Sequence, residues 1–86
     1  MEILIDGPTL VLSGDFDVRS TWMARSVIYD HLDSVEGDVV LDVSGVNSAD
    51  VTALKLLAVA TRQAHAEGRR LTLQGCTPAV RRMLHL

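Results

Sequence analysis

The stretch that decides the fold is Val39–Leu57, with the sequence VVLDVSGVNSADVTALKLL. It opens with an apolar run that is typical of a buried strand. The polar segment 44–50 comes next, and its composition predicts a turn. After the turn, apolar residues recur at helical spacing from Leu54 through Leu57 to Ala64. A strand, a turn and an amphipathic helix in this order predict an α/β domain.

The residues before this stretch predict a hairpin and a helix. Short strands are expected at 3–5 and 9–12, on either side of a turn at Asp6-Gly7-Pro8. A helix follows, with Asp17 or Ser20 as its N-cap. The apolar side of this helix is expected to hold Trp22, Met23, Val27, Ile28, Leu32 and Val35.

The residues after this stretch predict one more strand and one more helix. Gly68 is placed to end the preceding helix, and 69–74 reads as a strand. Thr77 and Pro78 predict the start of a final helix. The 25 residues of segment 44–68 suffice for a crossover between parallel strands. The sequence therefore predicts a single α/β domain over 1–86, a four-stranded mixed sheet with helices packed against it.

Length and composition narrow the class of protein. A chain of 86 residues is one domain, and the first residues lack the charge and the long apolar segment of a signal peptide. No apolar run is long enough to cross a membrane, so we expect no membrane insertion and a cytoplasmic location. The lone cysteine, Cys76, cannot form an internal disulfide and fits a reducing compartment.

The net charge of -3 conceals an asymmetry along the chain. Residues 1–50 hold ten acidic and two basic residues, whereas residues 51–86 hold one acidic and six basic residues. The arginine pairs at 69–70 and 81–82 have no aromatic residues between them, and the acidic half would repel phosphate. We therefore expect a protein partner rather than nucleic acid.

The predicted topology places the working surface at one edge of the sheet. In open α/β sheets, partners bind at the loops that follow the carboxyl ends of parallel strands. Two of these loops end in Asp17 and Asp50, so we expect both carboxylates at that edge. Asp50 is also the expected N-cap of its helix, because a carboxylate there satisfies free backbone N–H groups.

The same loops do not predict an active site. They contain no His, Lys or Tyr that would complete acid–base catalysis beside the two carboxylates. The chain also lacks the glycine-rich phosphate loops and the nucleophile elbow. The three histidines fall in different predicted helices, without the spacing of metal ligands. We expect a protein that is not an enzyme and that needs no metal or cofactor.

Five short segments resemble the STAS domain of bacterial anti-sigma factor antagonists, in the same order and at similar separations. They are Leu12–Asp17, Val40–Val46, Asp50–Leu54, Gly68–Leu71 and Thr77–Leu84. The resemblance covers essentially the whole chain. It implies a small mixed sheet with helices over it, in agreement with the pattern of the residues.

The resemblance also implies a regulatory site, from which this sequence departs. Family members carry Asp-Ser-Ser-Gly or Asp-Ser-Thr-Gly at the start of this helix, and the partner, an anti-sigma factor that is also a kinase, phosphorylates the first hydroxyl residue. Asp50 and Thr52 match the pattern, whereas Val51 stands at the phosphoacceptor position and Ala53 replaces the glycine. Because Val51 has no hydroxyl group, the resemblance predicts an antagonist whose phosphorylation switch is lost.

Three functional hypotheses follow from the resemblance. In the first, the domain binds an anti-sigma factor with a kinase-type ATPase fold constitutively and so frees a sigma factor. In the second, Thr52 has become the phosphoacceptor. In the third, the domain resembles the STAS subunits that bind the ATPase of lipid-transporting ABC systems. The first hypothesis assigns partner binding to Asp17, Asp50, Val51, Thr52 and Lys55.

The direction of the Val51 side chain is left open by the pattern. A residue in the first turn of a helix can face either the core or the solvent. An inward Val51 would simply pack, whereas an outward Val51 would form part of a binding surface.

Overall fold

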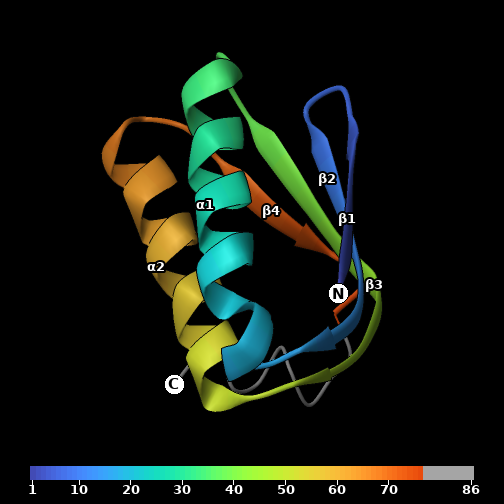
Figure 1. Cartoon of the computed structure of the whole chain (residues 1–86). Coiled ribbons are helices and arrows are strands. Elements are labelled where there is room, and N and C mark those ends of the chain that lie inside the picture. Colours follow the sequence, from blue (N-terminus) through green and yellow to red (C-terminus); the bar gives the residue numbers. More distant parts are fainter. Residues whose placement is uncertain (77–86) are drawn as a thin grey trace.

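In the part of the chain that the structure describes, two amphipathic helices cover one face of a four-stranded sheet (Figure 1). The computed structural model describes residues 1–76, and the helix expected after Pro78 lies outside them. The elements in chain order are β1 (Glu2–Asp6), β2 (Thr9–Phe16), α1 (Val18–Ser34), β3 (Val39–Ala49), α2 (Val51–Ala66) and β4 (Leu71–Gln74). The predicted α/β class and mixed sheet are confirmed.

The strands follow one another in the order β1-β2-β3-β4. β1 pairs with β2 in antiparallel fashion, and this pair forms the predicted hairpin. β2, β3 and β4 are parallel, and α1 and α2 connect them in turn. The carboxyl ends of β2 and β3 and the first turns of the helices therefore lie at one edge, at the bottom of Figure 1.

The core lies between the sheet and the two helices. Leu10, Leu12 and Phe16 of β2 are completely buried, because alternate residues of a strand point to the same face. Opposite them lie Ile28 of α1, which is also completely buried, and Leu57 of α2, which is 2% exposed. These aliphatic contacts hold the helices on the sheet and so fix the positions at which both helices begin.

Strand β3 extends further than the sequence indicates. Segment 44–49 was expected to be a turn, but it continues the strand and pairs with the end of β2 up to Phe16 and Ala49. The register shifts once between Val11 and Ser13 and again between Gly14 and Asp15, each time with an extra residue in β3. Because such bulges bend a strand, the paired ends of β2 and β3 sweep beneath the helices (Figure 1).

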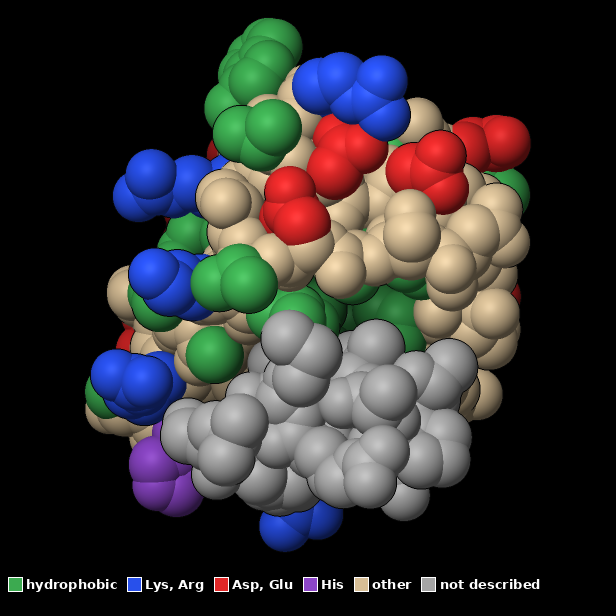
Figure 2. Space-filling model, turned by 90° about the horizontal axis from the view of Figure 1, so that it is seen from below, with side chains coloured by type: hydrophobic (Ala, Val, Ile, Leu, Met, Phe, Trp, Pro, Cys, Tyr) green, Lys and Arg blue, Asp and Glu red, His purple; other side chains and the backbone are tan. Residues whose placement is uncertain are grey.

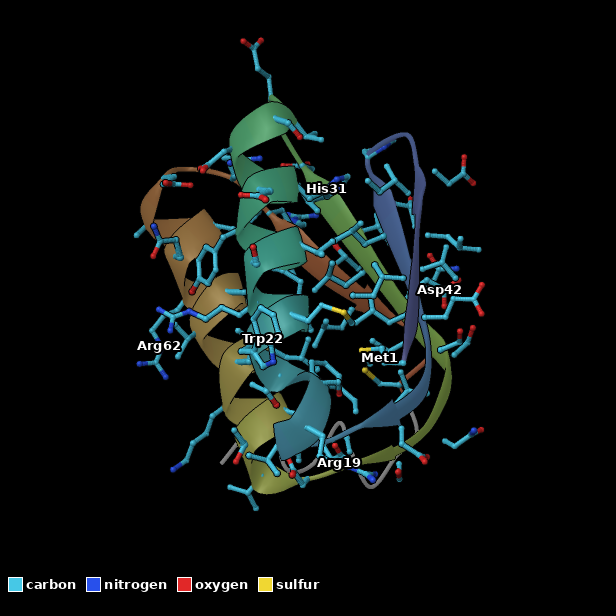
Figure 3. All side chains as sticks on the ribbon, viewed as in Figure 1. Met1, Arg19, Trp22, His31, Asp42 and Arg62 are labelled. Carbon is cyan, nitrogen blue, oxygen red and sulfur yellow. The ribbon has the colours of Figure 1, made fainter. Side chains whose placement is uncertain are left out.

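The exposed side of α1 also differs from the expectation. Trp22 is 75% exposed and Met23 is 36% exposed, although both were placed on the buried side. The buried residues of the helix are Ala24, Ile28, His31 and Leu32. The helix itself is correctly predicted, but Trp22 belongs to its outer surface (Figure 3).

His31 is buried, although its residue type favours an exposed position. Its side chain reaches from α1 toward the turn between β1 and β2 (Figure 3), and its Nε2 lies 2.9 Å from the carbonyl oxygen of Pro8. Because a carbonyl oxygen only accepts hydrogen bonds, Nε2 carries the proton. The same oxygen accepts a hydrogen bond of 3.2 Å from the backbone N–H of Val40. This carbonyl therefore joins the hairpin turn to both α1 and β3.

Replacing His31 tests this connection. We expect His31→Leu to lower the free energy of unfolding by about 1–2 kcal/mol, because the hydrogen bond to the turn is lost from a buried position. His65→Leu, at an exposed position of α2, should change it by no more than about 0.5 kcal/mol. Urea unfolding followed by circular dichroism measures both values. Equal effects of the two substitutions would contradict a stabilising role for the His31 contact.

Candidate functional site

Both helices begin at the edge where β2 and β3 end. β2 ends at Phe16 and is followed by Asp17, while β3 ends at Ala49 and is followed by Asp50. The backbone N–H of Asp50 donates a hydrogen bond of 3.1 Å to the carbonyl oxygen of Phe16. The two aspartates that were predicted to lie at one edge therefore do so, and a direct backbone contact joins their segments.

The carboxylate of Asp50 binds the first turns of both helices. Its Oδ1 accepts a hydrogen bond of 2.9 Å from the backbone N–H of Ala53, which makes Asp50 the N-cap of α2 as predicted. Its Oδ2 accepts a second hydrogen bond, also of 2.9 Å, from the backbone N–H of Val18 in α1. A negative charge at a helix N-terminus is stabilised by the helix dipole, and here one carboxylate serves two helices.

Asp17 is the N-cap of α1 and carries an ion pair. Its side chain accepts from the backbone N–H of Arg19, and Ser20 Oγ accepts in return from the backbone N–H of Asp17. The Arg19 guanidinium, 2.7 Å from the carboxylate, donates hydrogen bonds to it and lowers the pKa of Asp17 below its ordinary value. Of the two predicted N-caps, Asp17 is correct, and Ser20 completes a capping box.

The first turn of α2 presents an apolar and a polar side chain to solvent. Val51 is 58% exposed, so its side chain points outward rather than into the core. Thr52 and Lys55 are also exposed and line a groove between α2 and α1. Figure 2, which views this edge directly, shows acidic side chains gathered on it. The edge therefore combines carboxylates that are held by helix ends with an exposed valine and a hydroxyl group.

Three side chains of α1 extend this surface and were not predicted. Thr21, Arg25 and Tyr29 line the same groove as Thr52 and Lys55. Their spacing of four residues places them on one face of a helix. This spacing was the signal in the sequence that could have identified them as part of one surface. The sequence analysis placed Trp22 on the buried side of this helix, so the neighbouring face was not recognised as a surface.

A small cavity also lies close to this edge. It lies beside Phe16, Val46 and Leu57 and measures about 80 Å³. Ligand pockets usually measure about 300–1,000 Å³, so this space is too small for a cofactor. Within residues 1–76, no three His, Cys, Asp or Glu side chains come together as metal ligands. None of the helices in this range is long and apolar enough to span a membrane.

Comparisons with known proteins agree with this fold. The family model described as "Mlab, STAS domain" matches residues 4–86. The anti-sigma factor antagonist SpoIIAA in its unphosphorylated form is similar with a TM-score of 0.77 and 17% identity, over 98% of this chain and 80% of that chain. Phosphorylated SpoIIAA from Bacillus gives a TM-score of 0.75 at 17% identity, over 98% of this chain and 79% of that chain.

A larger protein contains a similar region. The crystal structure of Mglu matches with a TM-score of 0.70 and 19% identity, over 90% of this chain but only 20% of that chain. At such low identities, the structural similarities show the fold alone. A comparison with curated protein sequences gives no match.

Shortening Asp50 tests its contact with both helices. We expect Asp50→Ala to lower the free energy of unfolding by about 2–3 kcal/mol, because two backbone N–H groups lose their acceptor. Asp50→Asn keeps one side-chain oxygen as an acceptor and should cost less than alanine does. Thermal and urea unfolding give both values. Equal stability of the wild-type and alanine proteins would show that the two hydrogen bonds do not hold the helices.

Proposed function

The chain belongs to the STAS domain family, and we propose that it is a docking module that binds an anti-sigma factor with a kinase-type ATPase fold and so frees a sigma factor. The observation that carries the proposal is the exposed first turn of α2, where Val51 and Thr52 face solvent beside the carboxylate of Asp50. This turn corresponds to the regulatory segment of the antagonists that the sequence resembles. The proposal assigns binding without catalysis.

The edge suits a rigid docking surface. Asp50 bonds to the first turns of both helices and so fixes their relative position before any partner arrives. A pre-organised surface loses little conformational entropy when it binds. Asp17 and Lys55 supply charges at this edge, and the exposed Val51 supplies an apolar contact. We assign all five predicted residues to this surface, which adds Asp50 and Thr52 to these three.

Val51 makes the proposed interaction constitutive. A phosphate group at this position would add a charge of about -1.5 to -2 to the docking surface and repel a partner that fits the uncharged form. Valine has no hydroxyl group to accept phosphate. The domain would therefore stay competent for binding in the presence of the kinase and ATP.

An alternative within the same function is that Thr52, rather than residue 51, accepts the regulatory phosphate. Its side chain is exposed, so a kinase could reach its hydroxyl group. The hydroxyl lies one residue further into the helix than the acceptor of the antagonists. A phosphate on Thr52 would face the groove that Lys55 lines.

A second function remains a candidate because the matching family model is described by Mlab and not by an anti-sigma factor antagonist. In this case, the domain would be an accessory subunit that binds the ATPase of an ABC-type lipid transporter. The same surface would bind a different ATPase, without a sigma factor. The identity of the bound protein separates the two candidates.

Placing a charge at Val51 tests the docking surface. We expect Val51→Glu to weaken partner binding at least about tenfold, because a carboxylate would be buried without a partner in the complex. Ile5→Glu is a matched control, since Ile5 is 68% exposed but lies on β1, away from this edge. The tagged wild-type protein is first used for affinity purification from cells that express it, with ATP and magnesium, and mass spectrometry identifies the partner.

Binding constants are then measured with the purified partner. Loss of binding in Val51→Glu but not in Ile5→Glu supports docking at the start of α2. Equal binding by both variants would move the interface elsewhere. Recovery of an ABC ATPase, without an anti-sigma factor, would replace the first candidate with the second.

Restoring a hydroxyl group tests the lost switch. We expect Val51→Ser to accept labelled phosphate from ATP in the presence of the partner kinase, whereas the wild-type protein stays unlabelled. Phosphopeptide mass spectrometry locates the modified residue. Label on Thr52 of the wild-type protein would establish Thr52 as the phosphoacceptor, and an unlabelled serine variant would count against a kinase partner.

A further inference from the structure

A groove runs between α1 and α2 on the outer surface of the helix pair. The α1 side is formed by Thr21, Arg25 and Tyr29, and the groove encloses about 290 Å³ of open space. On the α2 side lie Thr52, Lys55, Leu56 and Val59. Residues three and four positions apart lie on one face of a helix, so each wall is a continuous stripe along its helix.

Both helices carry exposed apolar side chains on the faces that hold the groove residues. Val18 is 66% exposed and Trp22 is 75% exposed. Val18, Trp22 and Arg25 follow one another at spacings of four and three residues, so they lie on one face of α1. Trp22 projects from α1 away from the sheet (Figure 3). On the other wall, Val59 is 48% exposed. Large apolar side chains at solvent-facing positions of this kind are typical of a protein-binding surface.

The charges along the groove are all positive. Arg25 and Lys55 lie on opposite walls, and no carboxylate is among the lining residues. The Arg25 guanidinium lies 5.7 Å from the ring centre of Tyr29, so the ring supports it rather than an acidic group. Helix α2 carries Lys55 and Arg62 but no acidic residue between Val51 and Ala66. Arg62 extends outward from α2 (Figure 3).

We propose that this groove binds an acidic amphipathic helix of the partner protein. A helix laid in a groove inserts apolar residues at intervals of three and four, and the apolar side chains of both walls can receive them. Carboxylates beside those residues would face Arg25 and Lys55. From Thr52 to Val59 the groove spans seven residues of α2, about 10 Å, so it accommodates about two turns of the partner helix.

Charge argues for a different protein rather than a second copy of this chain. If two copies met through this groove, Arg25 and Lys55 of each would face the same cations of the other. Like charges at an interface oppose association. The inference rests on the proposed function as a docking module, but it does not depend on whether the partner is an anti-sigma factor or an ABC ATPase.

Site-specific photo-cross-linking locates the partner segment. p-Benzoylphenylalanine is introduced at Val59 in the groove, at Val51 at the helix edge, and at Thr72 as a control. Thr72 alternates with the inward residues Leu71 and Leu73, so it lies on the sheet face opposite the helices. After irradiation with the purified partner, mass spectrometry sequences the cross-linked peptide. We expect the Val59 probe to yield a peptide with acidic residues and with apolar residues spaced by three and four.

Reversal of one groove charge tests electrostatic recognition. We expect Lys55→Glu to reduce the yield from the Val59 probe at least about tenfold, because attraction becomes repulsion. Arg70→Glu changes the net charge equally at an exposed residue that does not line the groove. It should leave the yield within about twofold. Added salt should weaken the wild-type cross-link, as expected for exposed charges.

The outcomes separate this inference from the proposed function. Three outcomes would overturn the proposal that the groove binds an acidic helix. They are a neutral or basic peptide cross-linked at Val59, a cross-linked peptide of this chain itself, and equal effects of Lys55→Glu and Arg70→Glu. A cross-link at Val51 without one at Val59 would overturn the groove but keep the docking edge. The absence of any specific partner in the affinity purification would contradict both.

Discussion

The hydrogen bonds from Asp50 to both helices are the interaction on which the surface depends. A helix begins with backbone N–H groups that have no partner within the helix, and two such ends meet at one edge here. A single carboxylate accepts from Val18 in α1 and from Ala53 in α2. The first turns of the two helices are thus held together at this edge. Function and stability share this residue, so its substitution alone cannot separate them.

The charge asymmetry along the sequence appears in the structure as two surfaces of opposite charge, an acidic edge after β2 and β3 and a basic outer side of α2. Asp17 and Asp50 follow β2 and β3 and satisfy the helix ends there. Figure 2 shows acidic side chains on this face of the molecule. The outer side of α2 carries Lys55 and Arg62 without any acidic neighbour in that helix. The net charge of -3 hides this division. A partner that covers both surfaces must present cations or hydrogen-bond donors to one and carboxylates to the other, and this requirement favours one orientation of binding.

The helices and strands were predicted from the sequence better than their boundaries or the side chains that they bury. The stripe of α2 and both aspartate caps follow from local patterns, because periodicity and capping act within a few residues. Segment 44–49 looked like a turn because Gly45 and Asn47 are poor strand formers, yet its pairing with β2 keeps it extended. Trp22 is exposed because the helix buries only one side, and Ala24 and Ile28 occupy it. Burial of His31 depends on a carbonyl 23 residues away, which no local pattern contains.

The edge strand β1 has a further consequence, for the behaviour of the protein at high concentration. Leu4 and Ile5 are exposed there, and an open strand edge invites another chain to extend the sheet. Acidic residues, Glu2 and Asp6, occupy the two ends of the strand. If two copies paired antiparallel about Leu4, each Glu2 would lie opposite the Asp6 of the other copy, and like charges in that position are destabilising. The charges at both ends of β1 therefore oppose edge-to-edge association of copies of this chain into continuous sheets.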